Sequence, residues 1–273
     1  QSTVSILLCM VFSNDFSRFF NRILLFAATQ HVDKHDTITA MKSGIKAALV
    51  VLAAGSGTRF GHTTNKVWLP LSGRRIISRS LANASKNFKH GRTILVINPD
   101  DEEMARATLE REVRGFDVEI VYGGATRHES EYNALQHLAP AIAAGDIEVV
   151  LIHDGARPLA TPALFVEIAE AAHRHGGAIP TIAVDAREMD TVRSDTVVRV
   201  QTPQGFVAQQ LLEAYNSAAI DGFAGTDTAA CMEKYFPNIK TMSITADVSN
   251  VKITYPQDLA IAEHVLARRG YKD

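Results

Sequence analysis

Residues 50–61 are Val50-Val51-Leu52-Ala53-Ala54-Gly55-Ser56-Gly57-Thr58-Arg59-Phe60-Gly61, and Lys66 follows them. The apolar run predicts a buried strand, and the glycine-rich turn after it is typical of a backbone that wraps a polyphosphate. The small residues Ala53, Ala54, Gly55 and Gly57 allow the main chain close to a ligand, where its N–H groups form an anion-binding nest. Arg59 and Lys66 add full positive charges. The stretch therefore predicts a nucleotide site.

Two common phosphate-binding motifs do not fit this stretch. Walker A requires Gly-Lys-Ser/Thr at a fixed distance from the first glycine, and the dinucleotide fingerprint requires a glycine where Phe60 stands. An ordinary P-loop ATPase or NAD enzyme is therefore disfavoured. A glycine-rich loop by itself is also compatible with a β–α turn that binds no ligand. Other parts of the sequence are needed to distinguish the two.

From residue 46 onward, short apolar runs alternate with longer periodic segments. The runs predict strands at Ala47–Ala53, Thr93–Ile97, Val118–Tyr122, Val149–Ile152 and Ala178–Val184. The periodic segments predict helices at Ile76–Phe88, Asp101–Val113, His128–Leu138, Pro162–His175, Gln209–Phe223, Thr228–Tyr235 and Gln257–Ala267. This alternation predicts an α/β, Rossmann-like fold, with a mostly parallel sheet covered by helices on both faces.

In such a sheet, ligands bind beyond the carboxyl ends of the strands. The glycine-rich turn follows the first predicted strand, Gly123-Gly124 follows Tyr122, and Asp154 lies just after Ile152. Three chemistry-bearing segments are thus expected at one edge. This agreement favours a ligand site over a plain turn.

Bulk properties limit the partners and the compartment. The chain has 273 residues and a formal charge of −2, so one large domain without a basic field is expected, and nucleic acid is disfavoured as a partner. Cys9 and Cys231 form neither a disulfide framework nor a metal motif, which favours a reducing cytoplasm.

The first forty residues differ from the rest. Their two apolar runs, Ile6–Phe12 and Ile23–Ala28, are both shorter than the roughly 20 residues that span a bilayer, so no membrane association is expected. We interpret residues 1–40 as a leader or extension outside the fold and residues 41–273 as the domain. The alternative is an organelle transit peptide. Asp15, Asp33 and Asp36 argue against it, because transit peptides contain few acidic residues.

Five blocks in a fixed order carry a family resemblance. They are Ala53-Ala54-Gly55 with Arg59, Lys66 and Leu69-Pro70-Leu71-x-Gly73; Gly123-Gly124-Ala125-Thr126-Arg127-x-x-Ser130; Ile152-His153-Asp154-Gly155-Ala156-Arg157-Pro158; Gln201-Thr202-Pro203-Gln204-Gly205-Phe206; and Asn250-Val251-Lys252-Ile253-Thr254 with Pro256-x-Asp258-Leu259. Together they resemble the cytidylyltransferases that act on 2-C-methyl-D-erythritol 4-phosphate, and their relatives that act on ribitol 5-phosphate. The resemblance covers roughly residues 46–268.

The resemblance implies a nucleotidyltransferase-type fold and transfer of CMP from CTP to an alditol phosphate, with release of pyrophosphate. With methylerythritol phosphate as acceptor, this reaction serves isoprenoid precursor synthesis by the non-mevalonate pathway. Ribitol 5-phosphate is the alternative acceptor. An inactive nucleotide-binding module is an alternative from another class, which the presence of Arg59, Lys66, Asp154 and Lys252 together argues against.

The resemblance also implies roles for three cations. Arg59, Lys66 and Lys252 contact the phosphates of CTP and stabilise the transition state, because the reaction mainly requires positioned anions and neutralised charge. The alternative for Lys66 is a solvated loop lysine, and Asn65 stands where relatives commonly have proline.

A divalent cation, Mg²⁺, is expected on the triphosphate. Asp154 is the favoured ligand and Asp247 a weaker second one. The structural alternative for Asp154 is a helix cap or turn former.

Base recognition is expected from the backbone near Ala53 and from Gly123, Gly124 and Ser130. Many relatives have aspartate where Ala125 stands, and its absence removes one polar contact. Ser130 is equally suited to capping the helix that follows.

Arg157 is the expected contact of the acceptor phosphate, since a guanidinium binds phosphate in bidentate geometry. The resemblance implies a second acceptor contact from Thr191, in the pair Asp190-Thr191. Residues 185–200 are interpreted as a shortened β-arm that in relatives pairs with a second subunit, so a homodimer is expected. Arg193 and Arg199 are both candidates for the arm arginine. We expect structural roles for His153 and for Thr226-Asp227-Thr228, the latter as a helix cap.

Overall fold

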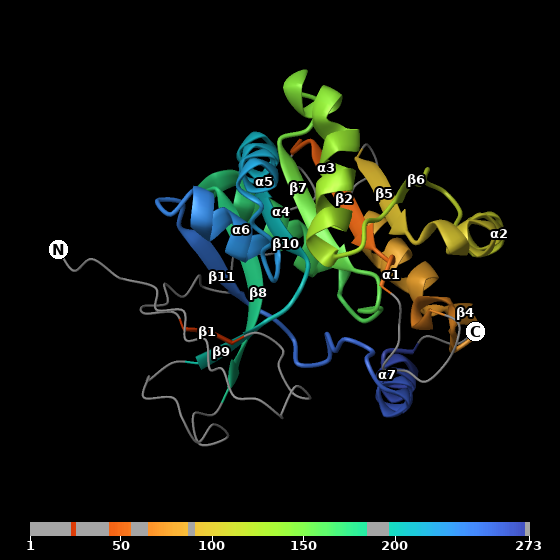
Figure 1. Ribbon diagram of the computed structural model, residues 1–273. Helices are drawn as coiled ribbons and strands as arrows, with labels where there is room; N and C mark the ends of the chain where they lie inside the picture. The colour runs from red at the N-terminus through yellow and green to blue at the C-terminus, as the bar shows by residue number, and fades with distance from the viewer. Residues whose placement is uncertain (1–22, 26–43, 56–64, 87–90, 185–196, 271–273) are drawn as a thin grey trace, which may run out of the picture.

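The structure is a computed structural model that describes residues 23–25, 44–55, 65–86, 91–184 and 197–270. These residues form a mixed sheet with helices on both faces (Figure 1). Within the described ranges the main sheet has nine strands in the order β1-β9-β8-β10-β7-β2-β5-β6, and β11 pairs with β8. The strands are β1 Ile23–Leu25, β2 Ala47–Leu52, β5 Arg92–Ile97, β6 Glu119–Tyr122, β7 Val149–Asp154, β8 Gly177–Val184, β9 Val197–Val200, β10 Gln204–Val207 and β11 Thr241–Thr245. The predicted mostly parallel α/β sheet is confirmed.

Strands β7, β2, β5 and β6 run parallel and form the half of the sheet that carries the glycine-rich turns. The other half is mixed, because β10 lies antiparallel between β7 and β8 and β9 lies antiparallel to β8. Neither β10 nor β11 was expected from the sequence. Two short hairpin strands, β3 Pro70–Leu71 and β4 Arg74–Arg75, form a separate small sheet.

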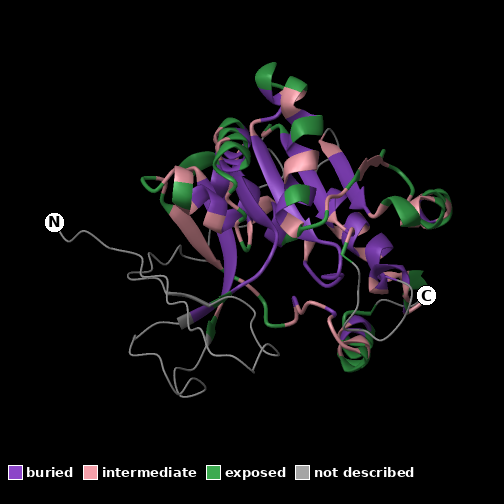
Figure 2. Ribbon diagram, in the orientation of Figure 1, coloured by how far each residue is buried: buried purple, intermediate pink, exposed green. Residues whose placement is uncertain are grey.

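The helices cover both faces of the sheet. One face carries α1 Ile76–Ser85, α2 Glu102–Glu112 and α4 Pro162–His175, and the other carries α3 Arg127–Ala143, α5 Ala208–Asp221 and α6 Thr228–Tyr235. The alternation in β2 shows why both faces are apolar: Ala48 and Val50 pack with the α3 side, whereas Leu49 and Val51 pack with the α4 side. Figure 2 shows the buried strands between helices whose outer surfaces are exposed.

Helix α7, Pro256–Arg268, packs apart from these two layers on a third apolar cluster that includes Leu71, Leu159 and Ile253. This cluster holds residues 250–254 against the segment after β7, since Ile253 N donates to Ala156 O at 2.9 Å. None of the helices in the described ranges has the length and apolar composition needed to cross a bilayer.

The predicted elements agree with the structure apart from their ends. Helix α3 continues to Ala143 through Pro140, and β7 extends two residues beyond Ile152 to Asp154. The β-prone run that ends at Val200 forms β9, which pairs with Thr181–Val184 of β8. Residues 185–196 of the expected arm lie outside the described residues.

Strand β1 lies within the segment interpreted as an extension. Its three residues pair antiparallel with β9, from Ile23 opposite Arg199 to Leu25 opposite Val197. The division into residues 1–40 and 41–273 stays a prediction, and this pairing is the contact that its test would remove.

Candidate active site

The carboxyl ends of three parallel strands bring the predicted segments to one edge. Leu52 lies opposite Asp154 in the β2–β7 register, and Ile97 lies opposite Tyr122 in the β5–β6 register. Backbone bonds continue this alignment, because Gly155 N donates to Leu52 O at 2.9 Å and Gly123 N donates to Ile97 O at 2.8 Å. Gly55, the Gly123-Gly124 turn and Asp154 therefore share this edge.

The turn after β6 packs closely on the end of β2. A Cβ atom on Gly123 would lie 2.5 Å from Ala54 Cβ and 2.7 Å from Ser130 Oγ, so only glycine fits there. Ser130 fastens the turn, because its hydroxyl accepts from Gly124 N at 3.1 Å and donates to Thr126 O at 2.8 Å. The N-cap of α3 is Thr126, in a capping box with Glu129. Ser130 is thus not the cap, and its contact with a base stays a prediction.

Asn65, the residue that departs from the family pattern, ties Lys66 to the end of β2. Its side-chain amide donates to Ala53 O at 2.6 Å, and its side-chain oxygen accepts from Val67 N at 3.3 Å. These bonds fix the start of the short 3₁₀ helix Lys66–Trp68, on which Lys66 is half-buried. Asn65 therefore fixes the position of this lysine next to Ala53, at the end of β2, without a proline. Gly55 lies within the described part of the glycine-rich turn and is exposed.

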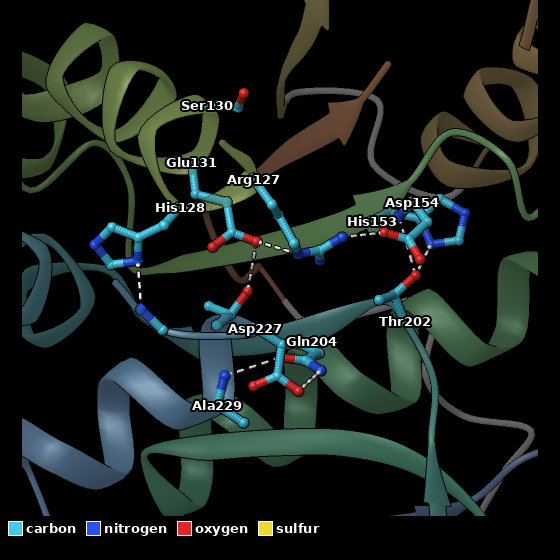
Figure 3. Close-up of polar contacts among 12 residues, drawn as sticks. Arg127, His128, Ser130, Glu131, His153, Asp154, Thr202, Gln204, Asp227 and Ala229 are labelled. Carbon is cyan, nitrogen blue, oxygen red and sulfur yellow. Dashed lines mark hydrogen bonds and ion pairs between the residues drawn. The ribbon is translucent and has the colours of Figure 1, made fainter. Parts of the chain in front are cut away.

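Asp154 is a buried carboxylate at the centre of a cluster of charges, and Figure 3 shows its contact with Arg127. Its Oδ2 atom lies 2.9 Å from Lys252 Nζ and 3.4 Å from Arg157 Nε, and its Oδ1 atom pairs with Arg127 Nη1. These cations come from α3, from the segment after β7 and from the segment before α7. One carboxylate thus gathers residues from three of the sequence blocks.

The charge balance explains how this cluster is stable. Burial raises the pKa of Asp154, but Arg127, Lys252 and Arg157 overcome that effect and hold the pKa well below its usual range. Burial lowers the pKa of Arg157, which Asp154 opposes. Asp154 is therefore ionised at neutral pH, and its site carries excess positive charge suited to an anion.

Hydrogen bonds from the Gln201-Thr202 block hold Asp154 and His153 in place. Thr202 Oγ1 accepts from Asp154 N at 3.0 Å and donates to His153 Nδ1 at 3.1 Å. The imidazole N–H at Nε2 then donates to Arg157 O at 3.2 Å. Burial lowers the pKa of His153 to about 3, so its ring is neutral. The structural role expected for His153 agrees with these contacts.

Asn250 links the Gln201-Thr202 block to the segment that carries Lys252. Its side-chain amide donates to Gln201 Oε1 at 2.8 Å and to Thr202 O at 3.0 Å, and its backbone carbonyl accepts from Arg157 Nη1 at 2.7 Å. Sequence reasoning placed Asn250 and Thr202 in family blocks without assigning them a role. The structure shows that they orient Arg157 and Asp154.

The carboxylates fit a cation that arrives with its own phosphate ligands better than a metal site built by the protein alone. Within the described residues, no group of three or more His, Cys, Asp and Glu side chains is placed to hold a metal ion. A carboxylate has about four lone-pair sites, of which Asp154 uses three on cations, so one is left for a further ligand. Mg²⁺ commonly binds through one or two carboxylates together with substrate phosphates.

Asp247 lies on a neighbouring turn and not in the charge cluster. Its Oδ1 accepts from Ser249 N at 2.7 Å, and hydrogen bonds from Ser249 lower its pKa. In the described part of the chain, no ion pair or hydrogen bond joins it to Asp154. Its role as a second metal ligand stays a prediction.

Three expected site residues, Arg59, Gly57 and Thr191, lie outside the described residues. The other expected residues either meet at the strand ends or border them. One important residue was missed: Arg127, quoted within the second block, has no role in the sequence interpretation but bridges Asp154 and Glu131. Its signal was the i, i+4 spacing to Glu131. The expected cap, Asp227, accepts from Ala230 N at 2.9 Å and begins α6.

Comparisons with known proteins identify the family. The family model for 2-C-methyl-D-erythritol 4-phosphate cytidylyltransferase matches residues 47–268. Among proteins of that name, the one from Cereibacter sphaeroides strain ATCC 17029 is 38% identical over 228 residues, covering 81% of this chain and 96% of its own. The one from Bacillus mycoides strain KBAB4 is 34% identical over 226 residues, covering 80% of this chain and 96% of its own.

Solved structures show the same likeness. The 4-diphosphocytidyl-2C-methyl-D-erythritol synthase from Anaerococcus prevotii superposes with a TM-score of 0.68 at 28% identity, covering 84% of this chain and 99% of that chain. The 2-C-methyl-D-erythritol 4-phosphate cytidylyltransferase from Thermus thermophilus gives 0.60 at 26% identity, covering 82% and 100%. With a family match over more than half of its length, this chain belongs to the 2-C-methyl-D-erythritol 4-phosphate cytidylyltransferase family.

Proposed function

We propose that this chain transfers CMP from CTP to 2-C-methyl-D-erythritol 4-phosphate, the cytidylyl step of isoprenoid precursor synthesis in the non-mevalonate pathway. The observation that carries the proposal is the Asp154 cluster. Three cations converge on one carboxylate at the carboxyl end of β7. Family membership gives this anion site its substrates.

The chemistry asks little of the protein beyond positioning. A phosphate oxygen of the acceptor attacks the α-phosphorus of CTP, a new P–O bond forms, and the bond to the β-phosphate breaks, so that pyrophosphate leaves with the electron pair. The attacking group is already an anion, and therefore no strong general base is required. Excess positive charge around Asp154 would stabilise the charge that develops on the phosphoryl oxygens.

The cations divide between the two substrates in this proposal. Lys252 would reach from Asp154 toward the α-phosphate, which its side chain, 34% exposed, allows. Lys66 and Arg59 would hold the outer phosphates of CTP. Arg157 would bind the acceptor phosphate with the guanidinium donors that Asp154 and Asn250 leave available, and Thr191 is the proposed second acceptor contact.

Mg²⁺ is the proposed cofactor, carried by the triphosphate and touched by Asp154, with Asp247 as the weaker second candidate. When bound, it would neutralise charge on the phosphate oxygens. A homodimer and a reducing cytoplasmic location are also proposed. The second rests on Cys231, a free thiol that is buried and whose pKa burial raises to about 12.

An acceptor screen tests the function. The purified chain is incubated with CTP, Mg²⁺ and either 2-C-methyl-D-erythritol 4-phosphate or ribitol 5-phosphate, and pyrophosphate release and the ³¹P spectrum of the product are measured. We expect a CDP-alditol with the first acceptor and at least tenfold lower kcat/KM with the second. The reverse preference would assign the ribitol activity. Product from neither acceptor, with CTP still bound, would favour a nucleotide-binding module.

A further inference from the structure

Glu131 is a buried carboxylate behind the active site that no part of the family argument uses. It lies on α3 where that helix meets α5 and α6, and its exposed fraction is 1%. Its Oε2 accepts from Tyr215 OH, and its Oε1 accepts from Thr228 Oγ1 at 3.1 Å. Arg127 Nε lies 2.9 Å from the same Oε1. Figure 3 shows Glu131 and Asp154 on opposite sides of the Arg127 guanidinium.

This arrangement is costly as a purely structural device. Burial raises the pKa of Glu131, against which Arg127, Tyr215 and Thr228 act. Replacing a buried ion pair by apolar side chains of similar volume is often neutral or stabilising. Stability alone therefore does not explain a carboxylate at this position, and we look for a function of Glu131 that an apolar side chain would lack.

The geometry of Arg127 supplies that role. An arginine facing one free carboxylate favours the bidentate fork, with two N–H groups on two oxygens. On Asp154, that fork would occupy Oδ2 as well as Oδ1. In the structure Arg127 uses only Nη1 on Asp154 Oδ1, while its Nε lies 2.9 Å from Glu131 Oε1 as an ion pair without a hydrogen bond. Oδ2 remains with Lys252 and Arg157.

A second observation concerns the remaining donor of the same guanidinium. Arg127 Nη2 is buried, and like Nε it forms no hydrogen bond among the described residues; unlike Nε, it has no ion-pair contact described. A buried charged donor without an acceptor is expensive unless a ligand or a water completes it. Glu131 holds the guanidinium in the orientation that leaves this donor unused beside Asp154.

We propose that Glu131 is a positioning residue for cytidylyl transfer: it holds Arg127 in a one-point contact with Asp154 Oδ1, so that Oδ2 stays with Lys252 and Nη2 stays available to an oxygen of the substrates. The inference rests on the proposed function. Tyr215 and Thr228 support it by fixing the carboxylate of Glu131. Glu131 touches no reacting atom and acts through Arg127.

The test compares Glu131→Gln with a matched control on the same pair of helices. The control is Gln136→Ala, which removes the exposed bond from Gln136 Nε2 to Asn216 Oδ1 (2.7 Å) between α3 and α5. We expect Glu131→Gln to lower kcat by about 10- to 100-fold, the range found when groups that orient reactive ligands are removed. The KM for CTP should change less than threefold, and the control should keep wild-type kcat. Unchanged kcat in a folded Glu131→Gln variant would overturn the proposal.

A double-mutant cycle separates positioning from general destabilisation. If Glu131 acts through Arg127, then adding Glu131→Gln to Arg127→Lys should lower kcat by less than threefold beyond the single Arg127→Lys variant. Independent, multiplicative losses would contradict the proposed route. Should Glu131→Gln fail to fold, Tyr215→Phe takes its place, because it removes one donor to Glu131 and keeps the ring stacked on His128 at 4.5 Å. That variant should lose about three- to tenfold in kcat, and full activity would count against the proposal.

A spectroscopic readout keeps the inference distinct from the proposed activity. The Nε–H proton of Arg127 is buried and ion-paired with Glu131. Assigned by its loss in Arg127→Lys, it should therefore exchange slowly with water in the wild-type protein and at least tenfold faster in Glu131→Gln, where the ion pair is lost. This result does not depend on which acceptor is used. Fast exchange in the wild type would refute the contact even in an active enzyme, whereas slow exchange in a chain that makes no product would refute only the function.

Discussion

Lys252 Nζ lies 2.9 Å from Asp154 Oδ2, although the two residues belong to different sequence blocks and to different layers of the molecule. The segment before α7 makes this contact possible, since Ile253 is buried in the α7 cluster and bonds to Ala156 O. A lysine whose ammonium is both paired and partly exposed can move its charge between the carboxylate and an incoming phosphate.

We expect Lys66→Ala and Arg59→Ala each to lower turnover at least 100-fold without unfolding the protein. Removing one preorganised charge from a transition state typically costs about 3–4 kcal/mol. Steady-state kinetics on variants with wild-type melting temperatures measure this effect. Losses below tenfold at both positions would contradict the phosphate roles of these two residues.

Two glycine substitutions should separate packing from ligand approach. Gly123→Ala places a methyl group 2.5 Å from Ala54 Cβ, so we expect a loss of about 1–3 kcal/mol in stability, as in other overpacked sites. Gly55→Ala meets no described atom within 4 Å and should keep the melting temperature. It should still raise the KM for CTP, because the added methyl lies on the turn expected to wrap the phosphates. Thermal melts and CTP titrations of both variants decide the matter, and a destabilised Gly55→Ala would show that this glycine serves packing.

His153 should make the stability of the protein fall in mild acid. Its folded pKa, about 3, lies below the unfolded value of about 6.5, so the unfolded state binds the extra proton and stability is lost as the pH falls from about 6.5 toward 3. Between pH 7.5 and 5.5 this loss amounts to about 1.4 kcal/mol. Urea unfolding of the wild type and of His153→Gln at both pH values isolates the effect, which should be absent in the variant. An equal pH dependence in the two proteins would place the titrating group elsewhere.

The sequence predicts the parallel half of this fold better than the mixed half. Ala47–Leu52 and Ile94–Ile97 are continuous apolar runs, and burial on both faces leaves that pattern in the sequence. Gln204–Val207 carries no such pattern, because its place between β7 and β8 is set by tertiary pairing. The site shows the same division. Asp154 was found from its strand end, whereas the bridge from Arg127 to Glu131 depends on how α3 docks, which spacing alone does not fix.

A variant that begins at Met41 should keep its activity and melt within a few degrees of the full chain. The described contact that it loses is the three-residue β1–β9 ladder, and short edge pairs contribute little to a sheet held by buried parallel strands. Differential scanning calorimetry and kcat/KM for CTP measure the result. A drop of more than about 10 °C would show that β1 belongs to the domain.

The last prediction concerns the arm and the homodimer. Arg199 lies on β9, is exposed, and its positive charge contributes to lowering the pKa of Arg157, so the two guanidinium groups act on the same region. If the arm serves the acceptor, Arg199→Glu should raise the KM for the acceptor at least tenfold and change the KM for CTP less than threefold. Arg193→Glu is the matched variant on the arm, and the larger effect of the two identifies the arginine in use. Light scattering should give twice the chain mass.

Mixing Arg199→Glu with a Lys252→Ala chain then decides which subunit supplies the arm. If the arm crosses to the partner, mixed dimers regain activity because one of their two sites has both wild-type residues; if each chain uses its own arm, no mixture recovers activity.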